Sequence, residues 1–133
     1  MTQLGSQNIQ MSITEFSGIA RVATSLAEAL APQQQQFLAD LIAIRSYTGE
    51  EGPAVARTLQ ELRTIGCDDV WMDSAGNALG RIGNGHRVIL YDAHLDTNEV
   101  ADASEWPHPP LEPVIEKGAM WGLGASDCKG GVA

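Results

Sequence analysis

The chain of 133 residues is long enough for one domain with a sizeable core, which its 5% of aromatic residues predicts to be mostly aliphatic. Its formal net charge of −9, from 17 acidic residues against 8 lysines and arginines, leaves no basic surface to attract phosphates. We therefore expect neither nucleic acid nor an anionic membrane as a partner, whereas the acidic balance is compatible with a site for a metal cation.

The cysteine content and the N-terminus both favour a cytoplasmic protein. Cys67 and Cys128 form neither a CxxC pair nor a disulfide framework. No apolar run reaches the length of a membrane span, and the N-terminus lacks the basic start and apolar block of a secretory signal. Residues 1–13 are predicted to be disordered, so that the folded part is predicted to begin at residue 14.

Three amphipathic helices are predicted in the N-terminal half, where apolar residues recur at intervals of three and four. They span residues 14–31, 32–45 and 54–65. Pro32 divides the first two because proline suits the first turn of a helix, and Gly66 ends the third because glycine accepts the left-handed conformation that follows a helix. The predicted apolar faces comprise Ile19, Val22, Leu26 and Leu30, then Phe37, Leu38, Leu41 and Ile42, then Val55, Leu59 and Leu62.

Strands are predicted in the C-terminal half, where the periodicity changes. They span residues 68–73, 78–82, 87–94 and 119–124, and the Asn-Gly pair at 84–85 is typical of a tight hairpin between the second and third. The third strand is the most apolar, and a buried strand of this kind normally has helices on both faces. A long loop with four of the six prolines is predicted at 98–118. Helices followed by strands favour the opening of an α/β domain.

The third strand ends in an unusual pattern of polar residues. Side chains alternate between the faces of a strand, so Asp92, His94 and Asp96 point to the same side. Successive members lie about 7 Å apart, too far for all three to bind one ion unless the backbone bends. An imidazole that binds a metal usually donates its other N–H to a carboxylate. The pattern therefore predicts His94 as a metal ligand supported by Asp96, although a strand ending in a solvated histidine fits the tripeptide alone more often.

A second stretch, GLGASDCKGG at 122–131, surrounds Asp127 and Lys129 with glycines. Such a loop could hold a carboxylate at the carboxyl end of a strand, where ligands bind in open α/β sheets. One carboxylate can bridge two metal ions that together activate a water. A simple turn with solvated Asp127 and Lys129 is the plainer alternative. The glycines do not fit a P-loop, which needs Gly-Lys-Ser/Thr, or a dinucleotide fingerprint, which needs glycine at 127.

The order of these motifs resembles the M20 family of zinc metallopeptidases and amidohydrolases. That family includes acetylornithine deacetylase, succinyl-diaminopimelate desuccinylase, carboxypeptidase G, aminoacylase and dipeptidases. The resemblance covers about residues 33–133 and rests on His-x-Asp at a strand end, a loop rich in proline, and Gly-x-Gly-x-x-Asp-x-Lys-Gly. The stretches AIRSYTGEEGPAV, DSAGNALGRIG and YDAHLDT are also similar to the family's N-terminal pattern, and YDAHLDT with SEW is similar to the hydrolase subgroup linked to selenium metabolism.

The resemblance implies a role for three residues. His94 would bind one zinc ion, Asp127 would bridge two zinc ions, and Asp96 would have the catalytic role of orienting and polarising His94. A cis peptide bond after Asp127 is also implied. The chain departs from the family pattern at Leu123, where arginine is usual, and at Cys128, where methionine is common. Cys128 is expected to be a packed small side chain rather than a thiol ligand.

The implied fold is the truncated N-terminal portion of a zinc-peptidase-like three-layer α/β/α catalytic domain, occupying residues 14–133. The resemblance places a Glu-Glu pair, a further acid, a late histidine and a dimerisation domain beyond residue 133. Without them each zinc would have too few protein ligands, and no general base would activate water.

The expected function is therefore that of a fragment of a dinuclear zinc hydrolase, inactive on its own. The parent enzyme, expected to be a homodimer, would cleave the amide bond of a small-molecule substrate, an N-acyl amino acid or a small peptide. Cobalt or manganese could replace zinc. Two alternatives remain open at this stage: a non-catalytic truncated or degenerate product that acts as a binding module, and a stand-alone metal-binding module.

Overall fold

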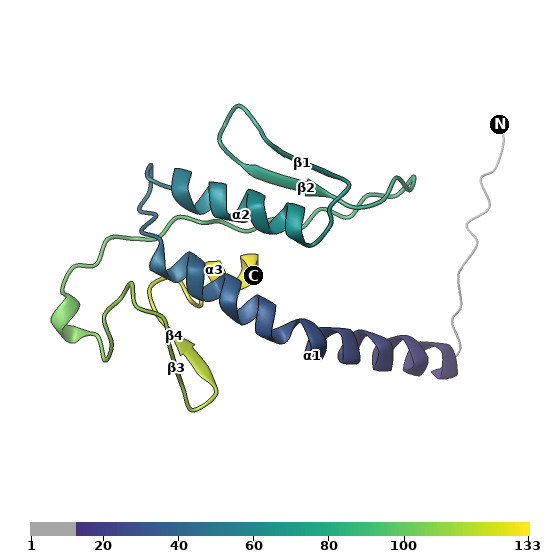
Figure 1. Ribbon diagram of the computed structural model, residues 1–133, viewed down its shortest axis with the longest axis horizontal. Helices are drawn as coiled ribbons and strands as arrows, with labels where there is room; N and C mark the ends of the chain where they lie inside the picture. The colour runs from purple at the N-terminus through teal and green to yellow at the C-terminus, as the bar shows by residue number, and fades with distance from the viewer. Residues whose placement is uncertain (1–12) are drawn as a thin grey trace, which may run out of the picture. The chain divides into compact units, whose positions relative to one another are not determined.

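The computed structural model describes residues 13–133 (Figure 1). The chain divides into two compact units, one ending at Gln33 and the other running from Gln34 to Ala133. The elements in chain order are α1 (Ile13–Ala43), α2 (Gly52–Thr64), β1 (Asp69–Met72), β2 (Ala78–Arg81), the 3₁₀ helix η1 (Ala103–Glu105), β3 (Val114–Glu116), β4 (Ala119–Trp121) and α3 (Lys129–Val132). This mixture of helices and strands confirms the α/β class. The predicted disorder over residues 1–13 falls, apart from Ile13, outside the described residues.

Helix α1 corrects one prediction about helix boundaries. Pro32 was expected to separate two helices, but it lies inside one continuous helix. Proline removes one backbone hydrogen bond, and the alanine, leucine and glutamine residues around it are strong helix formers that continue the helix. The division between the two compact units nevertheless falls one residue after Pro32, between Gln33 and Gln34.

The first unit contains the N-terminal part of α1 with its predicted apolar stripe. Within the described residues this stripe is exposed: the side chains of Ile19, Val22, Leu26 and Leu30 are between 49% and 61% accessible. No helix within residues 13–133 combines the length and apolar character needed to cross a bilayer.

The core of the second unit joins the C-terminal part of α1 to α2. Phe37, Leu41 and Ala54 form its centre, and Leu95 and Val132 pack against it. Arg57 on α2 lies over the ring of Phe37, 4.6 Å from the ring centroid. The guanidinium also forms ion pairs of 2.9 Å with Asp40 and 2.8 Å with Glu61. These contacts fix the end of α1 against α2.

Helix α2 also packs on the β1–β2 hairpin. The two strands pair antiparallel from Asp69 opposite Arg81 to Met72 opposite Ala78, as predicted for 68–73 and 78–82. Gly80 makes the close approach possible, because a Cβ at this position would lie 2.8 Å from Leu62 Cδ2. The helix ends before Gly66, whose φ of 84° is the left-handed conformation expected from the sequence.

A second hairpin lies partly in the segment that the sequence predicted as loop. β3 and β4 pair antiparallel from Val114 opposite Trp121 to Glu116 opposite Ala119. The turn between them uses Lys117 and Gly118, both at positive φ. This turn reverses the chain immediately, so that the last residues of the predicted loop can form a strand.

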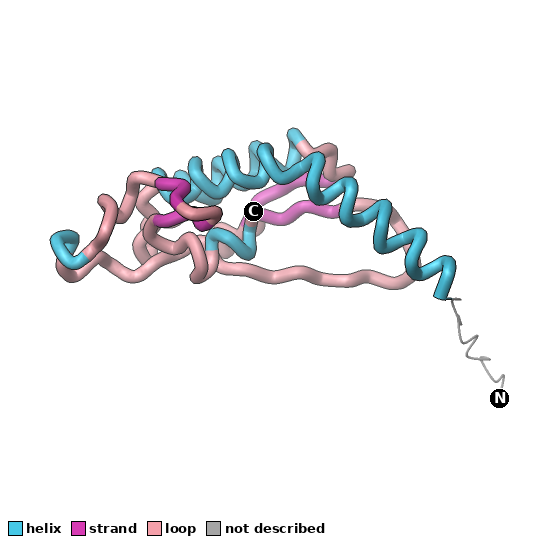
Figure 2. The backbone as a smooth tube through the Cα atoms, turned by 90° about the horizontal axis from the view of Figure 1, so that it is seen from below, coloured by secondary structure: helices cyan, strands magenta, loops and turns pink. Residues whose placement is uncertain are grey.

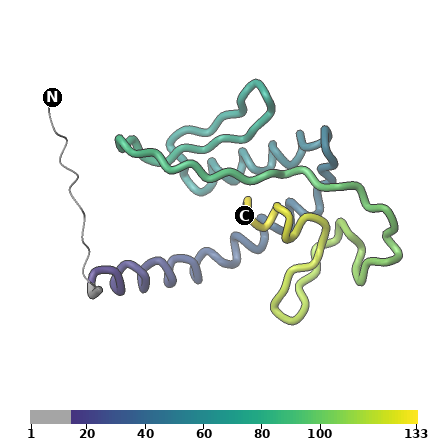
Figure 3. The backbone as a smooth tube through the Cα atoms, turned by 180° about the vertical axis from the view of Figure 1, so that it is seen from behind, coloured from purple at the N-terminus to yellow at the C-terminus, as the bar shows by residue number. Residues whose placement is uncertain are grey.

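The third predicted strand, at residues 87–94, does not form a ladder. Figures 2 and 3 show the chain between β2 and η1 as a long extended stretch, drawn as loop (pink) in Figure 2. No backbone-to-backbone hydrogen bond joins residues 84–94 to any other part of the chain that the structure describes, so the predicted hairpin at 83–86 is also wrong. Val88, Ile89, Leu90 and Tyr91 are 78–90% exposed. Apolar β-branched sequence favours an extended chain, but a strand exists only where neighbours accept its hydrogen bonds.

Candidate metal centre

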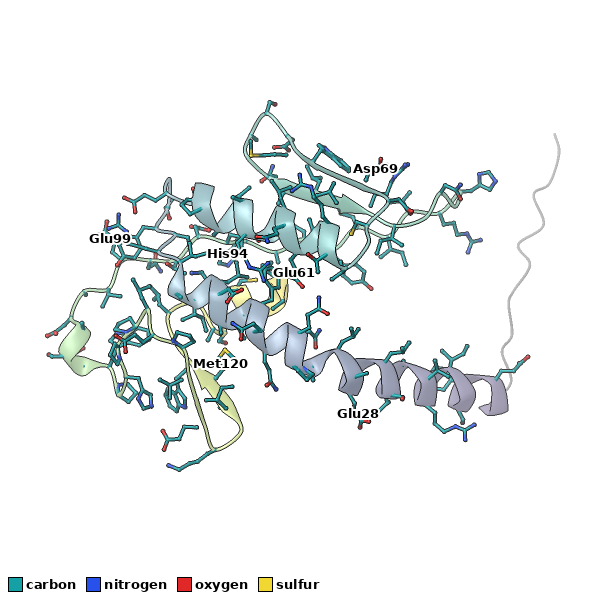
Figure 4. The ribbon with its side chains drawn as sticks, in the orientation of Figure 1. Glu28, Glu61, Asp69, His94, Glu99 and Met120 are labelled. Carbon is teal, nitrogen blue, oxygen red and sulfur yellow. The ribbon has the colours of Figure 1, made fainter. Side chains whose placement is uncertain are left out.

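The structure brings together two of the predicted site residues that lie 33 positions apart. His94 Nε2 is 2.9 Å from Asp127 Oδ1. The imidazole is 51% exposed and the carboxylate of Asp127 is 88% exposed, so solvent reaches the pair. Figure 4 labels His94 among the side chains near the C-terminal end of α1. The two residues come from the extended segment before η1 and from the glycine-rich loop before α3.

The other ring nitrogen of His94 faces Asp96. Nδ1 lies 3.1 Å from the backbone carbonyl oxygen of Asp96 and 3.2 Å from its Oδ1. The second carboxylate oxygen of Asp96 accepts a hydrogen bond of 2.8 Å from Thr48 Oγ1. Asp96 is therefore held where an orienting carboxylate would have to lie, and the local bend of the chain brings it closer to His94 than the regular strand geometry predicted.

This arrangement favours the protonated imidazole. Both ring nitrogens face acceptors, so the ring can donate to both only when it carries two protons. The hydrogen bond to Asp127, and next to it the one to the carbonyl of Asp96, raise the pKa of His94 above its ordinary value. A metal ion on Nε2 would take the place of one proton and leave Nδ1–H donating to Asp96.

The segment that carries His94 is fixed to the loop after α1. Thr97 N–H donates to the carbonyl of Ser46 at 2.8 Å, and Ser46 Oγ donates to the carbonyl of Leu95 at 2.7 Å. Tyr47 and Thr97 form an isolated parallel bridge. Ser46 is fully buried, so these polar contacts exclude water and hold the backbone on the C-terminal side of His94.

The position of the segment that carries Asp127 is set by close packing of its glycines. A Cβ at Gly122 would lie 2.3 Å from Ile42 Cγ2, so this position admits only glycine unless α1 shifts. Leu123, at the position where the family pattern has arginine, is buried, and its N–H donates to the carbonyl of Pro110 at 2.7 Å. The peptide bond between Asp127 and Cys128 is cis, as the resemblance implies.

A cavity of about 480 Å³ opens beside the pair, and residues that the sequence did not assign to the site also line it. His94, Asp96 and Cys128 form part of its wall. Glu51, which precedes α2, also lines the cavity. It was not assigned to the site from the sequence, because it lies far upstream of the motifs that contain His94 and Asp127. Asp92, which sequence reasoning left out of the site, lies there too; its position on the same face as His94 was the available signal.

Asn77 is a further lining residue that the sequence did not point to. Its place depends on the turn between β1 and β2, where Asp73 Oδ1 accepts from the N–H groups of Ala75 and Asn77, both at 2.9 Å. Asn77 Nδ2 also donates to Asp73 Oδ2 at 2.9 Å. These hydrogen bonds lower the pKa of Asp73, the one with the Asn77 side chain most strongly.

The donors fit zinc in type and spacing but not in number. Imidazole nitrogen and carboxylate oxygen are ordinary zinc ligands, and two ligands on a tetrahedral zinc lie about 3.3 Å apart, close to the distance between His94 Nε2 and Asp127 Oδ1. A zinc ion needs at least three protein ligands. Within residues 13–133 no three histidine, cysteine, aspartate or glutamate side chains are arranged to hold a metal ion.

Comparison with known proteins adds an independent observation. Residues 90–133 match the sequence model of peptidase family M20/M25/M40. The uncharacterized protein YgeY of Escherichia coli K12 is 38% identical over 98 residues, which are 74% of this chain and 24% of YgeY. Succinyl-diaminopimelate desuccinylases are also similar: that of Alkalilimnicola ehrlichii is 35% identical over 95 residues, 70% of this chain and 25% of the enzyme. That of Paracoccus denitrificans is 34% identical over 105 residues, 77% of this chain and 28% of the enzyme.

The chain thus spans about a quarter of the length of the curated relatives it matches. No solved structure matches it.

Proposed function

Because this chain belongs to the M20 family of peptidases and amidohydrolases and corresponds to the N-terminal part of its members, we propose that it supplies part of a dinuclear zinc site that hydrolyses amide bonds. The substrates are N-acyl amino acids or small peptides. The full-length protein works in the cytoplasm as a homodimer, and residues 13–133 supply one wall of its active site.

One observation carries the proposal. The family match covers residues 90–133, and within this segment His94 and Asp127 meet at 2.9 Å although 33 positions separate them. A zinc-type donor pair with a supporting carboxylate on the second ring nitrogen is the arrangement that zinc hydrolases use. The 480 Å³ cavity beside the pair has room for a small substrate.

Each side chain has a defined part in the proposed chemistry. His94 Nε2 and Asp127 would hold the metal, and Asp96 would fix the orientation of His94 through Nδ1. Bound zinc supplies Lewis acidity toward the amide carbonyl and lowers the pKa of a bound water. Asp92 and Glu51 make the cavity wall acidic, so a free amino group of the substrate is favoured there.

The described part of this chain cannot complete the site alone. His94 and Asp127 provide two ligands, and within residues 13–133 no third acidic, thiol or imidazole side chain joins them. The remaining ligands and the general base must come from sequence outside this quarter of the relatives' length. This count also argues against a stand-alone metal-binding module.

The test is a chimera. Residues 33–133 replace the corresponding part of a succinyl-diaminopimelate desuccinylase, and hydrolysis of N-succinyl and N-acetyl amino acids is measured with zinc present. Metal-dependent hydrolysis is expected, with a loss of at least about a hundredfold in His94→Ala and Asp127→Ala. The matched control is His86→Ala, an exposed histidine on the same extended segment, which should retain activity. A folded chimera that is inactive, or one in which His94→Ala keeps full activity, would refute the proposal.

A further inference from the structure

The buried side chain of Lys129 ends at the C-terminus of α1. Its Nζ donates hydrogen bonds to the carbonyl oxygens of Leu41 at 2.7 Å and Ile44 at 2.9 Å. The last carbonyls of a helix have no partner within the helix, and they carry its negative dipole end. Lys129 is fully buried, so its ammonium is committed to these carbonyls and not to solvent.

The aliphatic part of the Lys129 side chain is also closely packed. A Cβ at Gly124 would lie 3.1 Å from Lys129 Cδ and 2.8 Å from Thr97 Cγ2. The backbone N–H of Lys129 donates to the carbonyl of Gly124 at 2.9 Å. These contacts fix the position of the Lys129 side chain. Because Asp127 lies two residues earlier in the chain, Lys129 connects Asp127 to the C-terminal end of α1.

The segment with His94 is tied to the same end of α1. Ser46 follows the carbonyls that Lys129 binds, and it holds the carbonyl of Leu95 and the N–H of Thr97. Thr48 adds the hydrogen bond to the carboxylate of Asp96. Both halves of the candidate metal centre are thus anchored on residues 41–48, the segment that we call the α1 anchor.

We propose that Lys129 is a positioning residue: by binding the α1 anchor it sets the distance between Asp127 and His94. This inference rests on the proposed function, in which that distance admits a metal ion. Lys129 does not touch metal or substrate in this role. Its ammonium forms two charge-assisted hydrogen bonds away from water. These hydrogen bonds restrict the motion of the loop that carries Asp127.

The test is Lys129→Met in the metal-free 133-residue chain, with nuclear magnetic resonance of the His94 ring at a fixed pH well below the ordinary pKa of histidine, where the ring carries both protons. The Nε2–H proton reports the contact with Asp127, and the Nδ1–H proton reports the contact with Asp96 on the same segment as His94. Solvent exchange of Nε2–H is expected to become about tenfold faster, as when an ordinary hydrogen bond is lost, while exchange of Nδ1–H stays unchanged. A general loss of structure would accelerate both.

Lys117→Met is the matched control, because Lys117 is exposed and forms its ion pair with the neighbouring Glu116, away from the α1 anchor; neither proton should respond. Unchanged Nε2–H exchange in Lys129→Met would overturn the proposal. If that variant does not fold, Lys129→Gln decides: it keeps a polar side chain but weakens the same hydrogen bonds to Leu41 and Ile44, so it should also accelerate Nε2–H exchange, and no change would overturn the proposal.

A zinc titration of the unsubstituted chimera separates the two claims. A chimera that binds no zinc refutes the proposed function. The response of Nε2–H exchange to Lys129→Met is measured without metal, so it tests the positioning role of Lys129 independently of zinc binding.

Discussion

Two segments meet at the candidate metal centre, and they differ in how the chain holds them. The loop from Gly122 to Lys129 is fixed by contacts with α1, including a buried lysine and a glycine without room for a Cβ. The extended segment that leads to His94 has four consecutive apolar residues exposed by 78–90%. The loop is positioned by contacts available inside this chain, whereas a strand needs at least one neighbouring strand to accept its hydrogen bonds.

The largest expected effect comes from making the same leucine-to-alanine substitution in the packed region around α1 and in the extended segment. Leu41, the first residue of the α1 anchor, is fully buried, and Leu90 is 81% exposed on the extended segment. Leu41→Ala should lower the free energy of unfolding by about 3 kcal/mol, because it removes packed methyl groups and leaves a cavity, whereas Leu90→Ala should change it by less than about 0.5 kcal/mol. Urea unfolding followed by circular dichroism measures both. Equal losses would mean that the extended segment is packed in solution, contrary to the comparison.

A second pair of variants tests the glycines. A Cβ at Gly122 would meet Ile42 Cγ2 at 2.3 Å, whereas one at Gly85 would lie 3.8 Å from the carbonyl oxygen of Arg87, an ordinary van der Waals contact. Gly122→Ala should cost about 2 kcal/mol of unfolding free energy because the last turn of α1 must shift, and Gly85→Ala should cost less than about 0.5 kcal/mol. Thermal unfolding is a sufficient readout. A neutral Gly122→Ala variant would show that the loop does not rest on α1.

The smallest expected effect concerns the link between the two segments. Asp127 raises the pKa of His94 in the folded chain above its ordinary value of 6.5. The stabilisation from this contact is therefore complete below about pH 6.5, and it is lost as the pH rises through the folded-state pKa. Asp127→Asn should lower the pKa of His94 in a titration followed by nuclear magnetic resonance.

Asp92→Asn is the control for that titration, because it removes a nearby carboxylate with no hydrogen bond to the His94 ring among the described contacts. A His94 pKa that falls as much in this variant as in Asp127→Asn would assign the shift to general charge and not to the contact between the two segments.

The sequence predicted the elements that local contacts decide. Helix α2, the β1–β2 hairpin and Gly66 follow from apolar periodicity and from the conformational freedom of glycine, and each is confirmed. The continuity of α1 through Pro32 was missed, because one lost hydrogen bond is outweighed by the strong helix formers around it. The strand at 87–94 was predicted from its apolar residues, but pairing depends on neighbours that apolarity does not supply.

The residues of the candidate site also fall into two groups, those that the sequence predicted and those that only tertiary packing brings there. His94, Asp96 and Asp127 were predicted from motif order and family resemblance, and the structure places His94 in contact with each of the other two. Lys129 could be read from sequence as a solvated lysine in a turn, and it is buried instead, because its partners are carbonyls 85 and 88 residues earlier in the chain. Glu51 and Asn77 reach the cavity only through tertiary packing, which no local pattern records.

The central claim is that His94 and Asp127 are ligands of one metal centre. The most direct measurement is the zinc content per chain of the purified chimera, by elemental mass spectrometry, with and without Asp127→Ala. We expect two zinc ions per chain in the unsubstituted chimera and fewer than one in the variant, because a carboxylate that bridges two ions contributes to both sites. Equal zinc content in the two proteins would contradict the account.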